Sequence, residues 1–361
     1  MFHVARPLSA AAAVLLAAAA LAACGSSDDS SSSASQSGAS QTVSQGEGVS
    51  GLKVMLVDDD SIQGQSPTGS DGLGIYNLRK AFCSAGADVL VVGPWTVQSG
   101  QGSRLTLTGP VTVQAVTPPK GFESDCGSAP SGGKVFGVCA AKAPCVAPTT
   151  AAEGSPSASP SDSAALAVSE FLPKNYWPDG PDIVLSGVNF GQNDTVTAVH
   201  SGTTNAAVVA NRLGKPAIAV SEVLTLACLT TGKSCPQFKG AADFSVRLVG
   251  ELRKRELITP SLLLNVNYPH LEAGQAPKST QVNVLGKCTA INFGAKTPTS
   301  ATAVGKNGGT YEFGAIAPCK ETVKNADSTA IGEGHISVVS LDGSWNGKTS
   351  GTMEKALIDA E

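Results

Sequence analysis

Three short, mostly apolar runs, at residues 52–57, 87–92 and 181–186, most constrain what this chain can fold into. Their apolar residues do not alternate with polar ones, which is typical of strands buried on both faces of a parallel sheet. Ile75, Leu78 and Phe82, between the first two runs, have helical spacing. Strand, helix and strand form a βαβ unit with a right-handed crossover. The sequence therefore predicts an α/β fold with a mostly parallel sheet flanked by helices.

Three consecutive carboxylates, Asp58, Asp59 and Asp60, follow the first run. Ligands of open α/β sheets bind at the carboxyl edge of the strands, so these acids lie where a metal or phosphate site is expected. A solvated turn is the alternative, because Asp is common in turns and at helix N-caps. Taken alone, the three acids favour the turn.

Two further loops at the same edge carry polar side chains. Ser99 follows the second run, and Asn189 and Asn193 follow the third. A helix is predicted to begin just after Gly202, in the segment Ser201-Gly202-Thr203. Backbone N–H groups and hydroxyls at a helix start bind anions, although the same residues also cap helices. Three such loops at one edge favour a site.

Four motifs in order resemble the SurE (survival protein E) nucleotidases, also described as SurE-like acid phosphatases. The family has an NDDG-type strand end, an RSG-type loop, a SGxNxGxN loop and an HSGT helix start. They occur here as DDDS at 58–61, QSG at 98–100, SGVNFGQN at 186–193 and HSGT at 200–203. Weaker matches are SPSDS at 159–163, LNVNYP at 264–269 and GHISVVSL at 334–341. The resemblance covers residues 52 to about 342.

The resemblance implies a Rossmann-like, SurE-like domain that hydrolyses phosphomonoesters, commonly nucleoside monophosphates, with a divalent cation. The implied cation ligands are Asp59, Asp60, Ser99 and Asn189. All four supply oxygen, which suits Mg²⁺ or Mn²⁺. The implied phosphate-binding residues are Asn193, Ser201, Gly202 and Thr203. Either Asp59 or Asp60 is also expected to act as catalytic base, and a structural role is favoured for His200.

Two residues depart from the family pattern, because NDDG becomes DDDS. Ser61 replaces a Gly, which costs about 1 kcal/mol if the backbone there needs a positive φ. Asp58 adds a carboxylate, which strengthens cation binding and repels a phosphate dianion. The substrate is therefore the least certain part of what the family implies.

The first 50 residues predict export and a tether. Residues 1–24 have a basic start, an Ala/Leu/Val run and the sequence LAAC, which resembles the lipobox of a bacterial lipoprotein signal peptide lipidated at Cys24. An ordinary secretory signal is the alternative. Residues 25–50 are Ser-rich and predict a flexible tether, with the phosphatase domain at 51–361. The expected location is the outer face of the bacterial cytoplasmic membrane.

Eight cysteines follow Cys24, and an even number in an oxidising compartment predicts disulfides. Proximity favours the pairs Cys228–Cys235 and Cys288–Cys319. The other four, which leave more than one pairing open, are Cys83, Cys126, Cys139 and Cys145. The net charge of -4 does not indicate the excess of Lys and Arg that nucleic-acid-binding proteins carry, which argues against nucleic-acid polymers as partners.

The remaining chain is expected to be mostly scaffold. Residues 113–159 are irregular and rich in Pro, Gly and Ser, which predicts a disulfide-rich insertion at about 117–158. Helices are predicted at 164–172 and 241–257, and strands at 217–221 and 262–266. Segments 279–285 and 311–316 predict a small antiparallel extension. Because the family uses such an extension and a C-terminal segment in dimers, the resemblance also implies a homodimer with 353–361 as an exchanged helix.

Three function hypotheses follow. The leading one is an exported, lipid-anchored, metal-dependent nucleotidase. The second is a lipoprotein on the same fold that binds a nucleotide or metal with impaired turnover. The third, a solute-capture lipoprotein, calls for two similar α/β lobes, and the sequence shows no second lobe.

Overall fold

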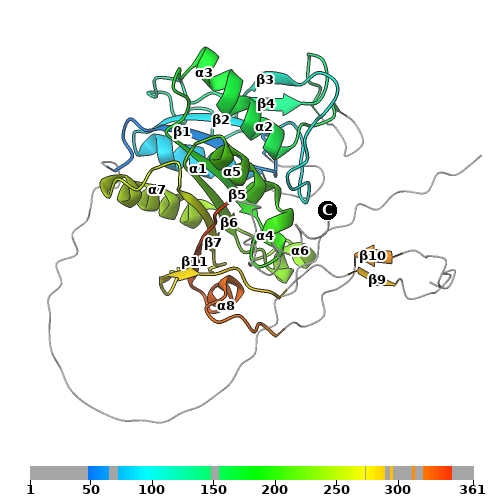
Figure 1. Ribbon diagram of the computed structural model, residues 1–361, viewed down its shortest axis with the longest axis vertical. Helices are drawn as coiled ribbons and strands as arrows, with labels where there is room; N and C mark the ends of the chain where they lie inside the picture. Colours follow the sequence, from blue (N-terminus) through cyan, green and yellow to red (C-terminus); the bar gives the residue numbers. More distant parts are fainter. Residues whose placement is uncertain are drawn as a thin grey trace, which may run out of the picture.

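A computed structural model describes residues 48–64, 72–147, 154–272, 274–288, 293–295, 311–313 and 320–343. It shows one twisted sheet with helices on both faces (Figure 1). The predicted signal peptide with Cys24, most of the tether and the C-terminal helix at 353–361 lie outside the described residues.

The nine-stranded sheet has the order β3-β4-β2-β1-β5-β6-β7-β11-β8. β1 (Lys53–Val57) lies between β2 (Asp88–Pro94) and β5 (Ile183–Phe190), and both neighbours are parallel to it. Parallel pairing continues outward through β4 (Val135–Cys139) on one side and through β6 (Ala217–Glu222) and β7 (Leu263–Tyr268) on the other. The predicted α/β class and its three buried strands are confirmed.

Alternate residues of β1 are buried in two different cores. Helices α1 (Leu73–Ser84) and α7 (Lys239–Lys254) cover one face, and α2 (Pro160–Leu166) and α5 (Gly202–Arg212) cover the other (Figure 1). Val54 and Leu56 belong to the first core, whereas Met55 and Val57 belong to the second. Burial on both faces explains the lack of polar alternation in this run.

The direction in which the chain builds the sheet reverses at β1. From β1 the chain moves to β2 and β4 on one side, and it then crosses to β5 on the other side. In open α/β sheets the crevice at such a reversal, outside the carboxyl ends of the strands, binds ligands. The acids that follow β1 lie at this reversal.

Three expectations were wrong in detail. The stretch at 113–159, which was expected to be irregular, contains most of β3 (Thr112–Val116) and all of β4. These two strands pair with each other antiparallel and join the main sheet. β8 (Thr280–Asn283), expected in the antiparallel extension, pairs parallel with β11 (Ile336–Ser340). β5 extends past residue 186 to Phe190, with a register shift between Ser186 and Asn189.

The other elements are short. β9 (Phe293–Ala295) and β10 (Tyr311–Phe313) form a separate antiparallel pair, which confirms part of the expected extension. The remaining helices are η1 (Ala167–Phe171), α3 (Leu172–Asn175), α4 (Thr197–His200), α6 (Leu226–Thr231) and α8 (Asp327–Gly332).

Three disulfides join described residues. The predicted Cys228–Cys235 pair is confirmed, and the four cysteines whose pairing was open form Cys83–Cys126 and Cys139–Cys145. Cys319 lies outside the described residues, so its pairing with Cys288 stays a prediction.

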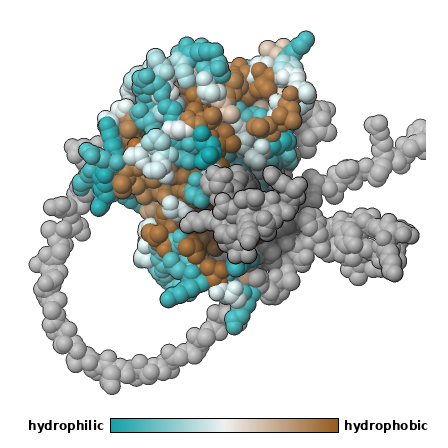
Figure 2. Space-filling view, in the orientation of Figure 1, coloured by the Kyte–Doolittle hydropathy of each residue, from teal (hydrophilic) through white to brown (hydrophobic). Residues whose placement is uncertain are grey.

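Hydrophobic and hydrophilic residues are interspersed over the described surface that Figure 2 shows. In the described part of the chain, no helix combines the length and the apolar character needed to cross a bilayer.

Candidate active site at the carboxyl edge of the sheet

Asp58, the first residue after β1, is a buried acid beneath the other two. Its Oδ1 accepts a hydrogen bond from the Asp59 N–H at 2.8 Å, and its buried Oδ2 has no partner among the described residues. Burial raises the pKa of Asp58 well above its usual value, and the nearby carboxylates of Asp60 and Asp59 raise it further. An acid in this position favours its protonated form unless a positive charge lies close by.

Asp59 faces the start of α5. The Thr203 hydroxyl donates a hydrogen bond to Asp59 Oδ1, and the Gly202 N–H also donates to this carboxylate. A Cβ on Gly202 would lie 2.7 Å from Asp59 Cβ, so only glycine lets the helix start come this close. Burial raises the pKa of Asp59, while the hydrogen bonds from Thr203 and Gly202 act in the opposite direction.

Asp60 joins the two other ligand-bearing loops. Its Oδ2 accepts a hydrogen bond from the Phe190 N–H at 2.6 Å, and its Oδ1 lies 3.5 Å from the Ser99 hydroxyl oxygen. Asn189, next to Phe190, donates its side-chain N–H to the Gly191 carbonyl at 2.7 Å. Its amide oxygen is therefore the side-chain atom that is available as a ligand. One carboxylate thus brings together the ends of β1, β2 and β5.

These residues fit a hard divalent cation in their chemistry. Asp59, Asp60, Ser99 and Asn189 supply oxygen only, as Mg²⁺ and Mn²⁺ prefer. In the described residues, no three His, Cys, Asp or Glu side chains form a group that could hold a metal. A cation here would therefore rely on the Ser and Asn oxygens as well as the carboxylates, with positions left for water and substrate.

The predicted phosphate-binding residues separate into two groups. Ser201 is the N-cap of α5 and accepts a hydrogen bond from the Thr204 N–H at 3.0 Å, while Gly202 and Thr203 contact Asp59. Asn193 is buried instead between β6 and β7. Its side-chain N–H donates to the Ser221 hydroxyl at 3.0 Å, and its carbonyl accepts from Asn265. The prediction that Ser201 caps the helix is confirmed. The phosphate contacts of all four predicted phosphate-binding residues remain predictions.

Ser61 has a φ of 78°, in the left-handed region that favours glycine. Its hydroxyl accepts a hydrogen bond from the Gln63 N–H at 3.2 Å. The position therefore needs the backbone conformation that a Gly in the family motif would supply without strain.

Sequence reasoning missed Arg104, on the loop after β2. Its Nη2 donates to Gln98 Oε1 at 2.7 Å and to the Ser157 carbonyl at 3.2 Å. Gln98 in turn donates its backbone N–H to the Asp59 carbonyl at 2.7 Å. The signal was visible in the sequence, because Arg104 is the only Lys or Arg between residues 95 and 111.

His200, for which a structural role was expected, is exposed at the end of α4.

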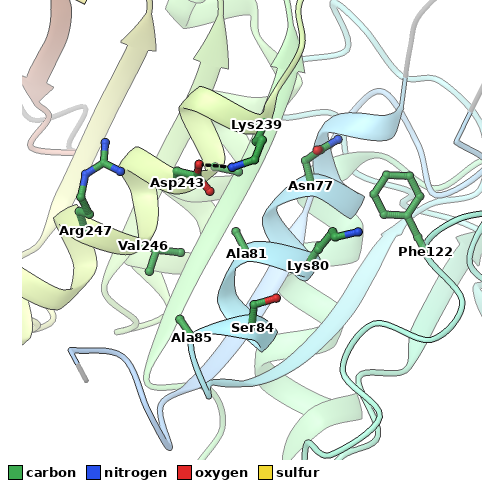
Figure 3. Close-up of a pocket in the computed structure, with 11 residues that line it drawn as sticks. Asn77, Lys80, Ala81, Ser84, Ala85, Phe122, Lys239, Asp243, Val246 and Arg247 are labelled. Carbon is green, nitrogen blue, oxygen red and sulfur yellow. Dashed lines mark hydrogen bonds and ion pairs between the residues drawn. The ribbon is translucent and has the colours of Figure 1, made fainter. Parts of the chain in front are cut away.

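A pocket of about 490 Å³ lies away from these acids, between α1 and α7 (Figure 3). Lys80, Lys239 and Arg247 lie around it, and Lys239 points toward Asp243, with which it forms an ion pair. None of the predicted ligand residues lines this pocket.

Comparison with known proteins agrees with the resemblance. The family model "Survival protein SurE" matches residues 54–290. A 5'-nucleotidase SurE from Solidesulfovibrio magneticus is 30% identical over 60% of this chain, and the match spans 65% of that protein's length. One from Xanthomonas campestris is 28% identical over 80% of this chain and 89% of its own.

A solved structure supports the fold. The SurE protein from Aquifex aeolicus has a TM-score of 0.58 and 24% identity, and the match covers 85% of this chain and 99% of that one. The family model spans well over half of this chain and includes the three strand ends that carry the candidate ligands. This chain belongs to the SurE family.

Proposed function

We propose that this chain is a divalent-cation-dependent phosphomonoesterase that acts on nucleoside monophosphates. One observation carries the proposal: Asp60 joins the Ser99 loop and the end of β5 beside Asn189 in a single hydrogen-bonded group. The relatives named 5'-nucleotidase SurE support the reaction class.

Asp60, Ser99 and Asn189 would hold the cation, with Asp59 beside them. When bound, such a cation polarises the phosphoryl group and lowers the pKa of a water. The SurE family generally depends on a divalent metal.

The start of α5 gives Asp59 a second role. Thr203 and Gly202 donate hydrogen bonds to its carboxylate, and a helix N-terminus stabilises negative charge. Burial raises the pKa of this carboxyl group, which suits a general base. Asp59 therefore accepts the proton of the attacking water, while Asp60 serves as a ligand.

The proposed cellular setting is outside the cytoplasmic membrane. The LAAC sequence ending at Cys24 supports lipid anchoring, and the Ser-rich segment after it supports a flexible connection to the folded domain. A homodimer is part of the same proposal.

The test is phosphate release by the purified chain from a panel of nucleoside monophosphates and simple phosphate esters, with Mg²⁺ or Mn²⁺ and with a chelator. We expect metal-dependent release. Asp60→Asn should lower kcat by more than the roughly 10- to 100-fold that loss of an outer-shell partner costs, whereas the exposed Asp179→Asn should match the wild type. No release from any substrate would contradict the proposal.

A binding protein without turnover is the second candidate. The observation that favours it is the change from NDDG to DDDS, which places a third buried acid, Asp58, next to Asp59. Calorimetry separates the two, because nucleotide binding without phosphate release would support the second candidate.

A further inference from the structure

The candidate site has an unbalanced charge. Asp58, Asp59 and Asp60 are all buried at the end of β1. The described parts of the loops that form the site, 58–64, 95–111 and 189–203, contain one Lys or Arg, which is Arg104. A phosphate dianion approaching the carboxylates of Asp59 and Asp60 is repelled before it reaches the proposed divalent cation, unless a positive charge lies on its path.

The backbone of Arg104 is connected to Asp59 through the starts of α2 and α5. Its N–H donates to the Gln101 carbonyl at 3.1 Å, and its carbonyl accepts a hydrogen bond from the hydroxyl of Ser159, the N-cap of α2. Pro160 follows Ser159 and packs against Gly202, since a Cβ on Gly202 would lie 3.0 Å from Pro160 Cγ. Gly202 itself lies against Asp59. Arg104 is thus connected to Asp59 through Ser159, Pro160 and Gly202.

The guanidinium of Arg104 is oriented by two hydrogen bonds that leave its other N–H donors available for a ligand. Both of its hydrogen bonds to described residues, to Gln98 and Ser157, come from Nη2. Gln98 also contacts the Asp59 backbone, so the guanidinium is linked to the acids through one residue. Arg104 is exposed, and its other N–H donors form a planar fork that matches a phosphate group.

We propose that Arg104 is a substrate-binding residue that attracts and holds the phosphate dianion over the carboxylates, oriented by Gln98. The inference rests on the proposed phosphomonoesterase function. It adds a positively charged side chain, that of Arg104, which binds the anionic substrate. Its effect is expected on substrate binding, because the guanidinium is exposed and is linked to the acids through Gln98.

The experiment compares steady-state kinetics of the full chain with those of Arg104→Ala, Arg104→Lys and Gln98→Ala at several salt concentrations. Arg247→Ala, which removes an exposed arginine from the pocket in Figure 3, is the matched control. Arg104→Ala should raise KM by roughly 10- to 100-fold, the range for losing a hydrogen bond to a charged group, with kcat much less affected. Arg104→Lys should recover part of this loss.

Two further readouts distinguish substrate binding from a structural role. Inhibition by inorganic phosphate should weaken in Arg104→Ala by about the factor found for KM. The salt dependence of kcat/KM should also become shallower, because the removed charge no longer steers the anion. Arg247→Ala should change neither property.

Each contrary result has a distinct meaning. An active wild type whose KM, phosphate inhibition and salt dependence are unchanged in Arg104→Ala would overturn this inference alone. If Gln98→Ala reproduced the full loss and Arg104→Lys restored nothing, Arg104 would only fix the loop, and the inference would be overturned. A wild type that releases no phosphate would overturn both the proposed function and this inference.

Discussion

At the scale of single residues, the site depends on how closely Gly202 approaches Asp59. Thr203 and Asp59 are 144 positions apart, yet one hydrogen bond joins the helix start to the acid. The absence of a side chain at position 202 permits this contact. The carboxylate proposed as base is therefore oriented by the helix start rather than by its own loop.

Gly202→Ala should lower both stability and activity. The new Cβ would lie 2.7 Å from Asp59 Cβ, and 3.0 Å from both Asp59 Oδ2 and Pro160 Cγ. Overpacking of this kind typically costs about 1–3 kcal/mol of unfolding free energy. Urea denaturation and phosphate release measure the two effects. Gly332→Ala in α8 is the control, because nothing lies within 4 Å of its Cβ position. Equal stability and activity for the two variants would contradict the account.

The family motif predicted only part of the site. The motif identified Ser61 as a position that needs a positive φ, and the structure confirms it. It did not identify the partners of Asp59 or the position of Arg104, because these contacts join loops that are distant in sequence. Spacing identifies residue types at one sheet edge, and packing decides which of them contact each other.

At the scale of elements, strands buried on both faces were predicted best. Their apolar runs reflect the two cores that meet at β1. β4 was missed because Gly137 lies in its middle, a residue that usually weakens a strand. The reason for that glycine is tertiary, since a Cβ there would lie 2.4 Å from Trp95 Cε3. The pairing of β8 was also missed, because its partner β11 lies about 50 residues further along the chain.

The disulfides should differ in what they contribute to stability. Cys83–Cys126 joins residues 43 apart, whereas Cys228–Cys235 joins residues seven apart. On a chain-entropy model the first contributes about 4 kcal/mol and the second about 2 kcal/mol. Urea denaturation of the two paired Cys→Ser variants tests the order. A larger loss on removal of Cys228–Cys235 would contradict it.

The loop after β5 and the start of α8 should make stability depend on pH. Burial raises the pKa of Asp194 from 3.8 to about 7, and the nearby carboxylates of Asp327 and Glu321 act in the same direction. The folded state therefore holds this proton more tightly than the unfolded state does. The stabilisation is complete below pH 3.8 and is lost as the pH rises through about 7.

Asp194→Asn should remove this part of the pH dependence, because Asn does not titrate. The measurement is unfolding free energy against pH for the wild type, for Asp194→Asn and for the exposed Asp179→Asn. The wild type and Asp179→Asn should lose stability between about pH 4 and pH 7 more steeply than Asp194→Asn does. Identical slopes for all three would contradict the assignment.

At the scale of the whole molecule, residues 48–50 and the acids lie at opposite ends of β1. Arg253 Nη1 donates to the Ser50 carbonyl at 2.7 Å and fixes the chain just before β1. The acids follow the other end of the same strand. The predicted tether would therefore join the folded domain at the end of β1 that lies away from the acids.

This geometry predicts how anchoring affects activity. The lipidated chain on liposomes should hydrolyse a soluble nucleoside monophosphate with the same kcat/KM as in detergent micelles, because the membrane does not cover the site. Phosphate release in the two preparations is the measurement. A strongly reduced kcat/KM on liposomes would contradict the predicted accessibility of the site.

The most direct test of the central claim is a crystal structure of this chain with Mn²⁺ and phosphate, with the metal located by its anomalous scattering. The account predicts one cation with oxygens of Asp60, Ser99 and Asn189 within about 2.0–2.6 Å, with Asp59 beside it and phosphate on its open side. A cation bound instead at Asp194, Asp327 and Glu321, or no cation at the end of β1, would contradict it.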